Sequence, residues 1–323
     1  MKRMTVLLFT IILTLSATTC SYNGVQKYNA SVKKESIEIK QVNPAASEPI
    51  PGGLSASNSQ SHINIKAGEA SKSGPIASFP WENDSDFIKQ QQKNGLYVLM
   101  GGYQTVLKDP LPGEEYNVHL AARLLAGKIV NPGQVFSQNA AAGPYTVDRG
   151  FRKGPTYMGV KLVTTIGGGV CKIASTLYNV AILSNLQIVE RHAHSMPVPY
   201  VPYGQDATVS YGNKDIKFKN NTSFPVMIWA VGIENILYIG FYGKEKPPKV
   251  EWHHETLNVV KAPVIYEKNP ELPKGTEKVK LEGMDGMTVK SHITIENPAG
   301  TPLVRNLGVS YYKPMPYIIE VNK

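Results

Sequence analysis

Cys171 is the residue of this chain best placed to do chemistry, because it follows Gly167, Gly168 and Gly169 closely and precedes an amphipathic stretch. Glycines at such a turn can adopt positive φ and let the backbone approach a substrate, so we expect all three to contact it. A helix that begins here would lower the pKa of the thiol and hold an oxyanion at its free N–H groups. Lys172 adds a positive charge nearby. The sequence therefore predicts a thiolate nucleophile for acyl transfer.

A cysteine nucleophile works with a base, and the segment that begins at Glu190 offers two histidines. As a strand, this segment would place Glu190, His192 and His194 on one face. Asp206 follows a turn-prone loop and could return to orient an imidazole. Cys171, a histidine and Asp206 would then form the set that covalent acyl transfer requires.

Other interpretations of the same residues stay open. Cys171 could be a buried apolar filler, each histidine a hydrogen-bonded structural residue, and Asp206 a turn or cap residue. Cys171, His192 and His194 could hold an open zinc site, although their spacing fits no short zinc motif. Because of that spacing we expect no metal. We also expect no cofactor, since no phosphate-binding loop or dinucleotide fingerprint is present, and the sequence contains no serine nucleophile elbow.

The N-terminus has the order of a secretory signal over residues 1–20. Lys2 and Arg3 precede an apolar run at residues 6–15, which is shorter than the roughly 20 residues of a spanning helix. Cys20 stands where a lipoprotein signal places its lipidated cysteine, and lipidation and ordinary cleavage both remain open. We therefore expect an extracytoplasmic protein, attached to the membrane only through a lipid on Cys20, in which Cys171 has no disulfide partner.

Composition is that of a folded protein, with 42% hydrophobic and 18% charged residues. The net charge of +9 favours anionic surroundings, which outside the membrane are wall polymers and lipid head groups. The basic residues are scattered rather than clustered with aromatic residues, so we expect no nucleic-acid partner. His253 and His254 are adjacent and are interpreted as surface residues.

The residues above must be positioned by helices and strands. The order of these expected elements along the chain predicts an α+β fold, with helices packed on a mainly antiparallel sheet. Residues 21–90, rich in Ser, Asn, Pro and Gly, predict a flexible tether, and residues 96–245 a catalytic domain. Apolar spacing predicts helices over 118–125, ended by Gly127, and over 172–184. Strands are predicted at 187–194, 207–211, 216–218, 225–231 and 236–242, the last two forming a hairpin. After a boundary at 246–249, residues 250–323 predict a small all-β module.

Several strings in the middle of the chain closely resemble the VanW family. They are NPG at 131–133, GGGVC at 167–171, STLYN at 175–179, ER at 190–191, HS at 194–195 and DATV at 206–209. The C-terminal module, with Gly275, Gly283, Gly286 and Gly300, is similar to the five-glycine domain of wall-associated proteins. By that resemblance it would bind glycan.

The family resemblance implies peptidoglycan L,D-transpeptidase activity with Cys171 as the nucleophile. It favours His194 over His192 as the base and places Arg191, His192 and Ser195 near the substrate, where Arg191 either binds a stem carboxylate or braces the fold. The family usually has Gln where this chain has Lys172, a departure that could change substrate preference or weaken catalysis.

We therefore expect a wall-associated enzyme that forms or edits cross-links between peptidoglycan stem peptides through a cysteine thioester. The alternative is a non-catalytic peptidoglycan-binding VanW protein linked to the response to glycopeptide antibiotics such as vancomycin.

Overall fold

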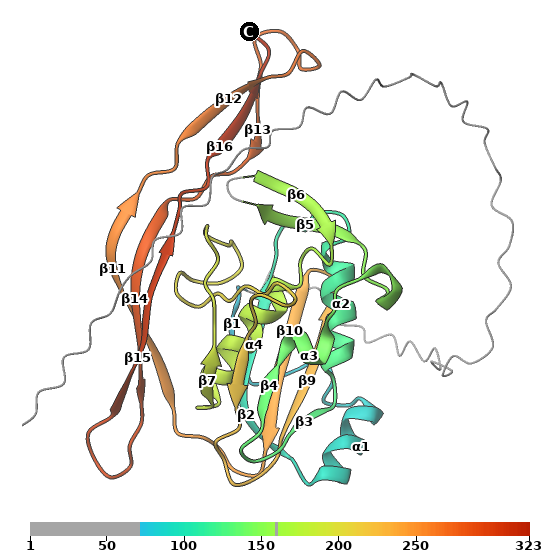
Figure 1. The fold of residues 1–323 in the computed structure, drawn as a ribbon, viewed down its shortest axis with the longest axis vertical. Coiled ribbons are helices and arrows are strands. Elements are labelled where there is room, and N and C mark those ends of the chain that lie inside the picture. The colour runs from blue at the N-terminus through green and yellow to red at the C-terminus, as the bar shows by residue number, and fades with distance from the viewer. Residues whose placement is uncertain (1–71, 159–160) are drawn as a thin grey trace, which may run out of the picture. The chain divides into compact units, whose positions relative to one another are not determined.

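The computed structural model describes residues 72–158 and 161–323 (Figure 1). The predicted signal, Cys20 and most of the predicted tether lie outside these residues. Within the described part of the chain, no helix is long and apolar enough to cross a membrane.

The centre of the part of the described chain before residue 250, the N-terminal half, is an antiparallel five-stranded sheet in the order β1-β2-β10-β9-β3. Its strands are β1 (Gly74–Pro75), β2 (Val98–Val106), β3 (Lys128–Val130), β9 (Val226–Ile233) and β10 (Ile236–Gly243). β9 and β10 form the predicted hairpin, in which Ile233 pairs with Ile236 and the turn residue Glu234 has a φ of 51°.

Both faces of this sheet are covered, which the alternation along β9 makes clear. Val226, Ile228 and Ala230 belong to one buried cluster, whereas Met227 and Trp229 belong to another. Successive side chains of a strand point to opposite faces, so each cluster occupies one face. Helices α2 (Glu114–Leu125) and α4 (Cys171–Leu183) supply side chains to the first cluster and pack against strands of the sheet.

The second face is covered by residues that we predicted to be tether. Phe79 and Trp81 are buried there with Phe87 of helix α1 (Ser85–Asn94), and the Trp81 indole donates to the Tyr242 hydroxyl at 2.9 Å. Burial of each large aromatic side chain is worth about 2 kcal/mol. The prediction of a tether up to residue 90 was therefore wrong for residues 72–90, because the aromatic residues outweigh the local Ser and Pro content.

The helix predictions are confirmed, since α2 ends beside Gly127 and α4 spans the second predicted helix within one residue at each end. The strand predictions were less accurate for residues 187–211. The predicted strand 187–194 stops at β7 (Gln187–Glu190), and the predicted strand 207–211 forms only an isolated bridge at Ser210. This stretch of backbone instead bonds to α4 and to the C-terminal module.

Smaller elements complete the N-terminal half. β4 (Val135–Ser137), β8 (Lys217–Lys219) and β7 form a three-stranded sheet, and β5 (Lys153–Met158) pairs with β6 (Lys161–Ile166). The short helix α3 (Gln138–Ala142) and the 3₁₀ turn η1 (Val147–Arg149) lie between β4 and β5 along the chain.

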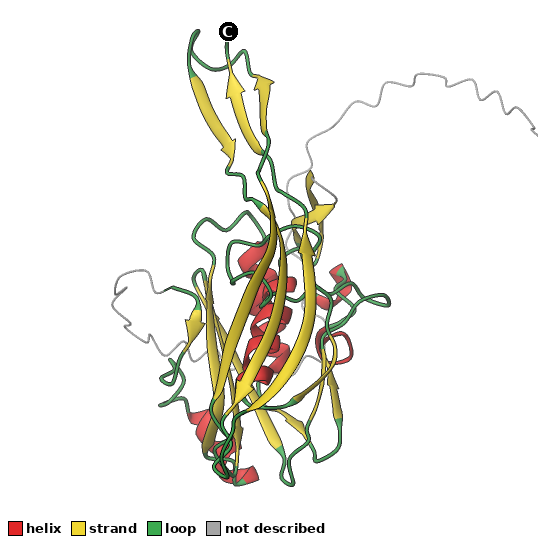
Figure 2. Cartoon of the chain, turned by 90° about the vertical axis from the view of Figure 1, so that its left-hand side faces the viewer, coloured by secondary structure: helices red, strands yellow, loops and turns green. Residues whose placement is uncertain are grey.

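The C-terminal residues form an all-β module, as predicted, whose first strand is β11 (Val250–Val260). One sheet has the order β11-β14-β15, with β14 (Gly286–Ile295) and β15 (Leu303–Tyr312). The other has the order β12-β16-β13, with β12 (Val264–Lys268), β13 (Glu277–Leu281) and β16 (Tyr317–Val321). Trp252, Ile293 and Ile295 join the cluster that contains α4, so α4 is buried between the five-stranded sheet and this module (Figure 2).

Candidate functional site

One face of α4 builds the site. Cys171, Ser175 and Asn179 are spaced four residues apart and therefore lie on one side of the helix. The Ser175 hydroxyl donates to the carbonyl of Ala207 at 3.0 Å and accepts from its N–H at 2.9 Å. The Asn179 amide donates to the carbonyl of Gln205 at 2.8 Å. These bonds hold the segment that carries Asp206 and Thr208 against the helix that begins at the thiol.

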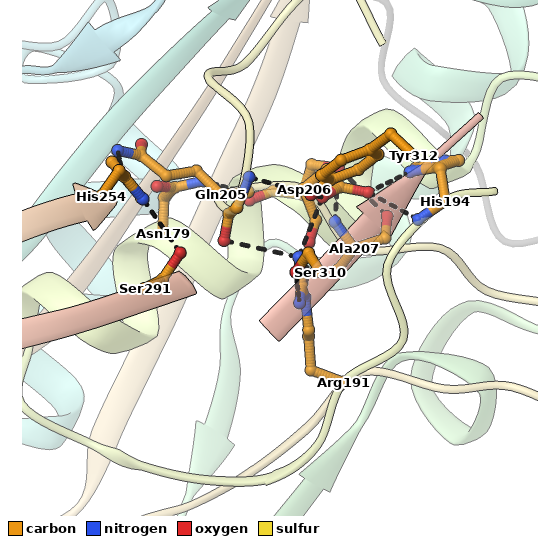
Figure 3. Close-up of polar contacts among 12 residues, drawn as sticks. Asn179, Arg191, His194, Gln205, Asp206, Ala207, His254, Ser291, Ser310 and Tyr312 are labelled. Carbon is orange, nitrogen blue, oxygen red and sulfur yellow. Dashed lines mark hydrogen bonds and ion pairs between the residues drawn. The ribbon is translucent and has the colours of Figure 1, made fainter. Parts of the chain in front are cut away.

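His194 and Asp206 form a tight pair beside that thiol. One Asp206 oxygen, Oδ2, accepts the His194 backbone N–H at 2.7 Å and lies 2.6 Å from its Nδ1. Because the carboxylate can only accept, Nδ1 carries the proton and Nε2 is the ring nitrogen left for the thiol. The second oxygen, Oδ1, accepts from Arg191 at 2.9 Å and from the Tyr312 hydroxyl at 2.5 Å (Figure 3).

The charges of this cluster support one another. Burial would raise the pKa of Asp206, but the bonds and charges of His194 and Arg191 hold it below its ordinary value. Burial would lower the pKa of His194, but Asp206 and Cys171 raise it to about 9. Burial would likewise raise the pKa of Cys171, yet the bond and charge of His194 bring it below its ordinary value. The arrangement favours a thiolate and imidazolium pair.

Cys171 is half-buried at a cavity of about 590 Å³. Its sulfur lies 3.3 Å from the Thr208 hydroxyl and 3.6 Å from the Val209 carbonyl. No side chain caps the N-terminus of α4, so the partial positive charge of the helix is directed at the sulfur. If the carbonyl carbon of a substrate lay above the thiol, its developing oxyanion would lie near the backbone N–H groups of the first turn of α4.

The three glycines line this cavity, but the conformation and packing of the turn also require residues without side chains. Gly167 and Gly169 have φ of 78° and 100°, as the turn requires. A Cβ atom on Gly168 would collide with the carbonyl of Gly154. The buried Asn117 side chain of α2 fixes the turn by donating to the Gly168 carbonyl at 2.8 Å. Gly168 therefore also approaches strand β5 closely, and its contact with a substrate stays a prediction.

Lys172 does not act on the thiol as we expected. It is fully buried and does not line the cavity, and its ammonium group donates to Glu115 at 2.8 Å and to the Asn235 carbonyl at 2.9 Å. The lysine that replaces the family's usual Gln is thus paired with α2 and with the β9–β10 turn.

The other three predicted substrate-binding residues do not line the cavity of Cys171. His192 pairs with Glu190 at 3.0 Å and lines a different cavity, because the chain leaves the strand after Glu190 and the predicted shared face of the two histidines does not form. Arg191 braces the fold, because its guanidinium is committed to Asp206 and Ser310. Ser195 is exposed and its carbonyl accepts from the Lys313 N–H at 2.8 Å.

The same placement removes the zinc alternative. His192 does not line the cavity of Cys171, and the part of the chain that the structure describes holds no group of three His, Cys, Asp or Glu residues able to bind a metal. His254 is exposed, as expected, and its Nε2 lies 3.0 Å from the Gln205 side-chain amide, a contact that links the two halves (Figure 3).

Sequence reasoning missed several residues of the site. Tyr312 and Ser310 come from β15, more than a hundred residues after Asp206, and no local pattern links them. Glu114 lines the cavity, and burial raises its pKa to about 7. The polar residues Ser175 and Asn179 on an apolar helix were the available signal, since buried polar side chains need partners.

The fold and the site together define an α+β protein built around a cysteine, histidine and aspartate cluster at a helix N-terminus. Residues 113–242 match the family model described as "VanW like protein", so this region of the chain is similar to that family.

Two curated relatives align with this region. The uncharacterised protein YoaR of Bacillus subtilis is 34% identical over 146 residues, which are 45% of this chain and 48% of that protein. The vancomycin B-type resistance protein VanW of Enterococcus faecalis is 32% identical over 159 residues, which are 48% of this chain and 56% of that protein. The chain spans about half the length of these relatives.

Two solved G5 domain structures also align with part of the chain. One, from an IgA1 protease, is 24% identical over 24% of this chain and 95% of its own, with a TM-score of 0.16. The other is 12% identical over 23% of this chain and 97% of its own, with a TM-score of 0.14. At scores this low, the description of the C-terminal module rests on its own strands.

Proposed function

We propose that this protein is a cell-wall enzyme of the L,D-transpeptidase type, which forms or edits peptidoglycan cross-links through a thioester on Cys171. The observation that carries the proposal is the pairing of Asp206 with His194, which lines one cavity together with a thiol at a helix N-terminus and lowers the pKa of that thiol. Activated cysteines of acyl-transfer enzymes have these features.

In the first half of the proposed reaction, the Cys171 thiolate attacks the carbonyl carbon of the L-to-D peptide bond of a donor stem. The oxyanion forms near the N-terminus of α4. As the tetrahedral intermediate collapses, the C–N bond breaks and the His194 imidazolium gives its proton to the departing amine of the terminal D-residue. The stem remains on Cys171 as a thioester.

In the second half, a side-chain amine of another stem attacks the thioester carbonyl. His194, now neutral, takes a proton from that amine, and the C–S bond breaks to release the Cys171 thiolate. Asp206 keeps its charge throughout, holding the imidazole in the tautomer that presents Nε2 to the sulfur. The partners in this proposal are peptidoglycan stem peptides and glycan outside the membrane, reached through an N-terminal signal.

The deciding experiment is mass spectrometry of the intact protein after incubation with a tetrapeptide stem. We expect a mass increase equal to the stem without its terminal D-residue, located on Cys171 and absent from Cys171→Ala. The non-catalytic alternative predicts no adduct, slow labelling of Cys171 by thiol reagents and stem binding that survives Cys171→Ala. Failure to detect an adduct, with the thiol intact and the stem bound, would exclude the enzyme.

A further inference from the structure

A second and larger cavity of about 890 Å³ lies away from the thiol. Its lining comes from β7 and the residues after it in the N-terminal half, and from β15 in the C-terminal module. It is therefore a feature that only the two halves together can form.

The charges around this cavity have one sign. Arg191, Lys214 and Arg305 line it, together with His192, and none of its described lining residues is an aspartate or a glutamate. Two of the basic groups already have partners, since Arg191 is paired with Asp206 and His192 with Glu190. The charge available for a ligand thus comes from Lys214 and Arg305.

Arg305 is incompletely satisfied. Its Nη2 donates to the Asn185 side chain at 3.0 Å, whereas Nη1 is buried with no hydrogen-bond partner in the described part of the chain. Neither Arg305 nor Lys214 forms an ion pair with any carboxylate that the structure describes. A buried charged donor without a partner is costly, and a carboxylate is the ligand whose geometry matches a guanidinium.

Lys214 connects this cavity to the site. Lys214 lines both this larger cavity, called the basic cavity from here on, and the cavity of Cys171. A peptide whose reactive carbonyl lies at the thiol can therefore extend past Lys214 toward Arg305.

We infer that the basic cavity is a binding site for a free carboxylate of a wall peptide, with Arg305 and Lys214 as the groups that bind it. This inference rests on the proposed function for the identity of the peptide. It gives the fold a means of selecting stems that carry an unamidated carboxylate, because an amide would leave the guanidinium unpaired.

The test is calorimetric titration of the full chain carrying Cys171→Ala, which cannot turn over, with two probes. One is a tetrapeptide stem with free carboxylates, and the other is the same peptide with its carboxylates amidated. Arg305→Gln should weaken binding of the free acid by about tenfold or more and leave binding of the amide unchanged, since a hydrogen bond to a charged group is lost. Lys214→Gln should act in the same direction, and Arg305→Lys should restore part of the affinity.

The matched control is Lys128→Gln, which removes an exposed charge on β3 outside the cavity and should change neither affinity. Because Arg305 also holds Asn185, the thermal midpoint of each variant is recorded, and Lys214→Gln gives an independent reading. Equal affinity of parent and both variants for the free acid, or equal weakening for both peptides, overturns the inference.

The two proposals fail separately. If the acyl adduct forms on Cys171 in the native chain but peptide affinity does not depend on Arg305 and Lys214, the assignment of the cavity is wrong and the proposed function is supported. If affinity depends on those residues but no adduct ever forms, the assignment of the cavity is supported and the proposed enzymatic function is wrong.

Discussion

At the residue scale, the proposed reaction depends on a proton shared between Cys171 and His194. Burial alone disfavours the thiolate, so the imidazolium must be present for the sulfur to ionise below its ordinary pKa of 9.0. That imidazolium persists because Asp206 and the thiolate raise the pKa of His194 to about 9, after burial has opposed it. Each group therefore keeps the other charged over the same range of pH.

The first prediction concerns how alkylation of Cys171 depends on pH. In the native chain, a lowered thiol pKa means that the thiolate, and hence the rate of alkylation, is present below pH 9.0. His194→Ala removes the main group that lowers it and leaves only the bonds of Thr208 and Val209 to oppose burial, so the rise in rate should move to higher pH and the rate at pH 7 should fall several-fold. Iodoacetamide labelling followed over a range of pH measures this shift.

The control for that experiment is His192→Ala, since His192 pairs with Glu190 and lines the other cavity. Its profile should match that of the native chain. A His194→Ala profile that coincides with the native one would show that the thiol is not activated by this histidine. Acylation by a stem peptide should fall more, by about 10²–10⁴, because His194 also transfers protons in that reaction.

At the element scale, α4 is held at its first turn by a buried ion pair as well as by its apolar face. Lys172 joins this helix to Glu115 of α2 and to the Asn235 carbonyl in the β9–β10 turn. Removing one partner of a buried pair leaves an uncompensated charge and costs about 3–5 kcal/mol. We expect Lys172→Met to lose stability of this order, measured by urea unfolding.

The double variant Lys172→Gln with Glu115→Gln, which removes both charges, should recover much of that loss. Because Lys172 does not line the cavity, Cys171 alkylation in the double variant should keep the native dependence on pH. A native-like stability for Lys172→Met, or a shifted alkylation profile in the double variant, would contradict this account of the departure from the family pattern.

How much the sequence could predict follows from the range of each interaction. The helices predicted over 118–125 and 172–184 and the β9–β10 hairpin depend on spacing within a few residues, and the structure has helices at 114–125 and 171–183 and the hairpin. The segment after Glu190 did not follow its alternating pattern, because its polar groups bond to Asp206 and to β15 instead of to a neighbouring strand. Phe79 and Trp81 were misjudged because a few aromatic residues order a segment of otherwise polar composition.

At the scale of the whole molecule, the C-terminal module contributes directly to the surroundings of the proposed catalytic carboxylate. The Tyr312 hydroxyl donates to Asp206 Oδ1 at 2.5 Å and accepts from the Gly204 N–H at 2.8 Å, and Ser310 accepts from Arg191 at 2.7 Å (Figure 3). The module therefore helps to orient the aspartate that orients the histidine. A wall-binding appendage attached by a linker would have no such bonds.

The last prediction compares two tyrosines that join the halves. Tyr312→Phe leaves Asp206 without one donor and the buried Gly204 N–H without its acceptor, which should cost about 1–3 kcal/mol of stability and slow acylation of Cys171 about tenfold. Tyr203→Phe removes a bond of the same kind, to the Asp285 carbonyl at 2.7 Å, that does not reach Asp206. It should lose stability while acylation at saturating stem stays at the native rate. If both variants slow acylation equally, the module acts through general stability alone; a loss confined to Tyr312→Phe means that Asp206 is positioned across the two halves of the chain.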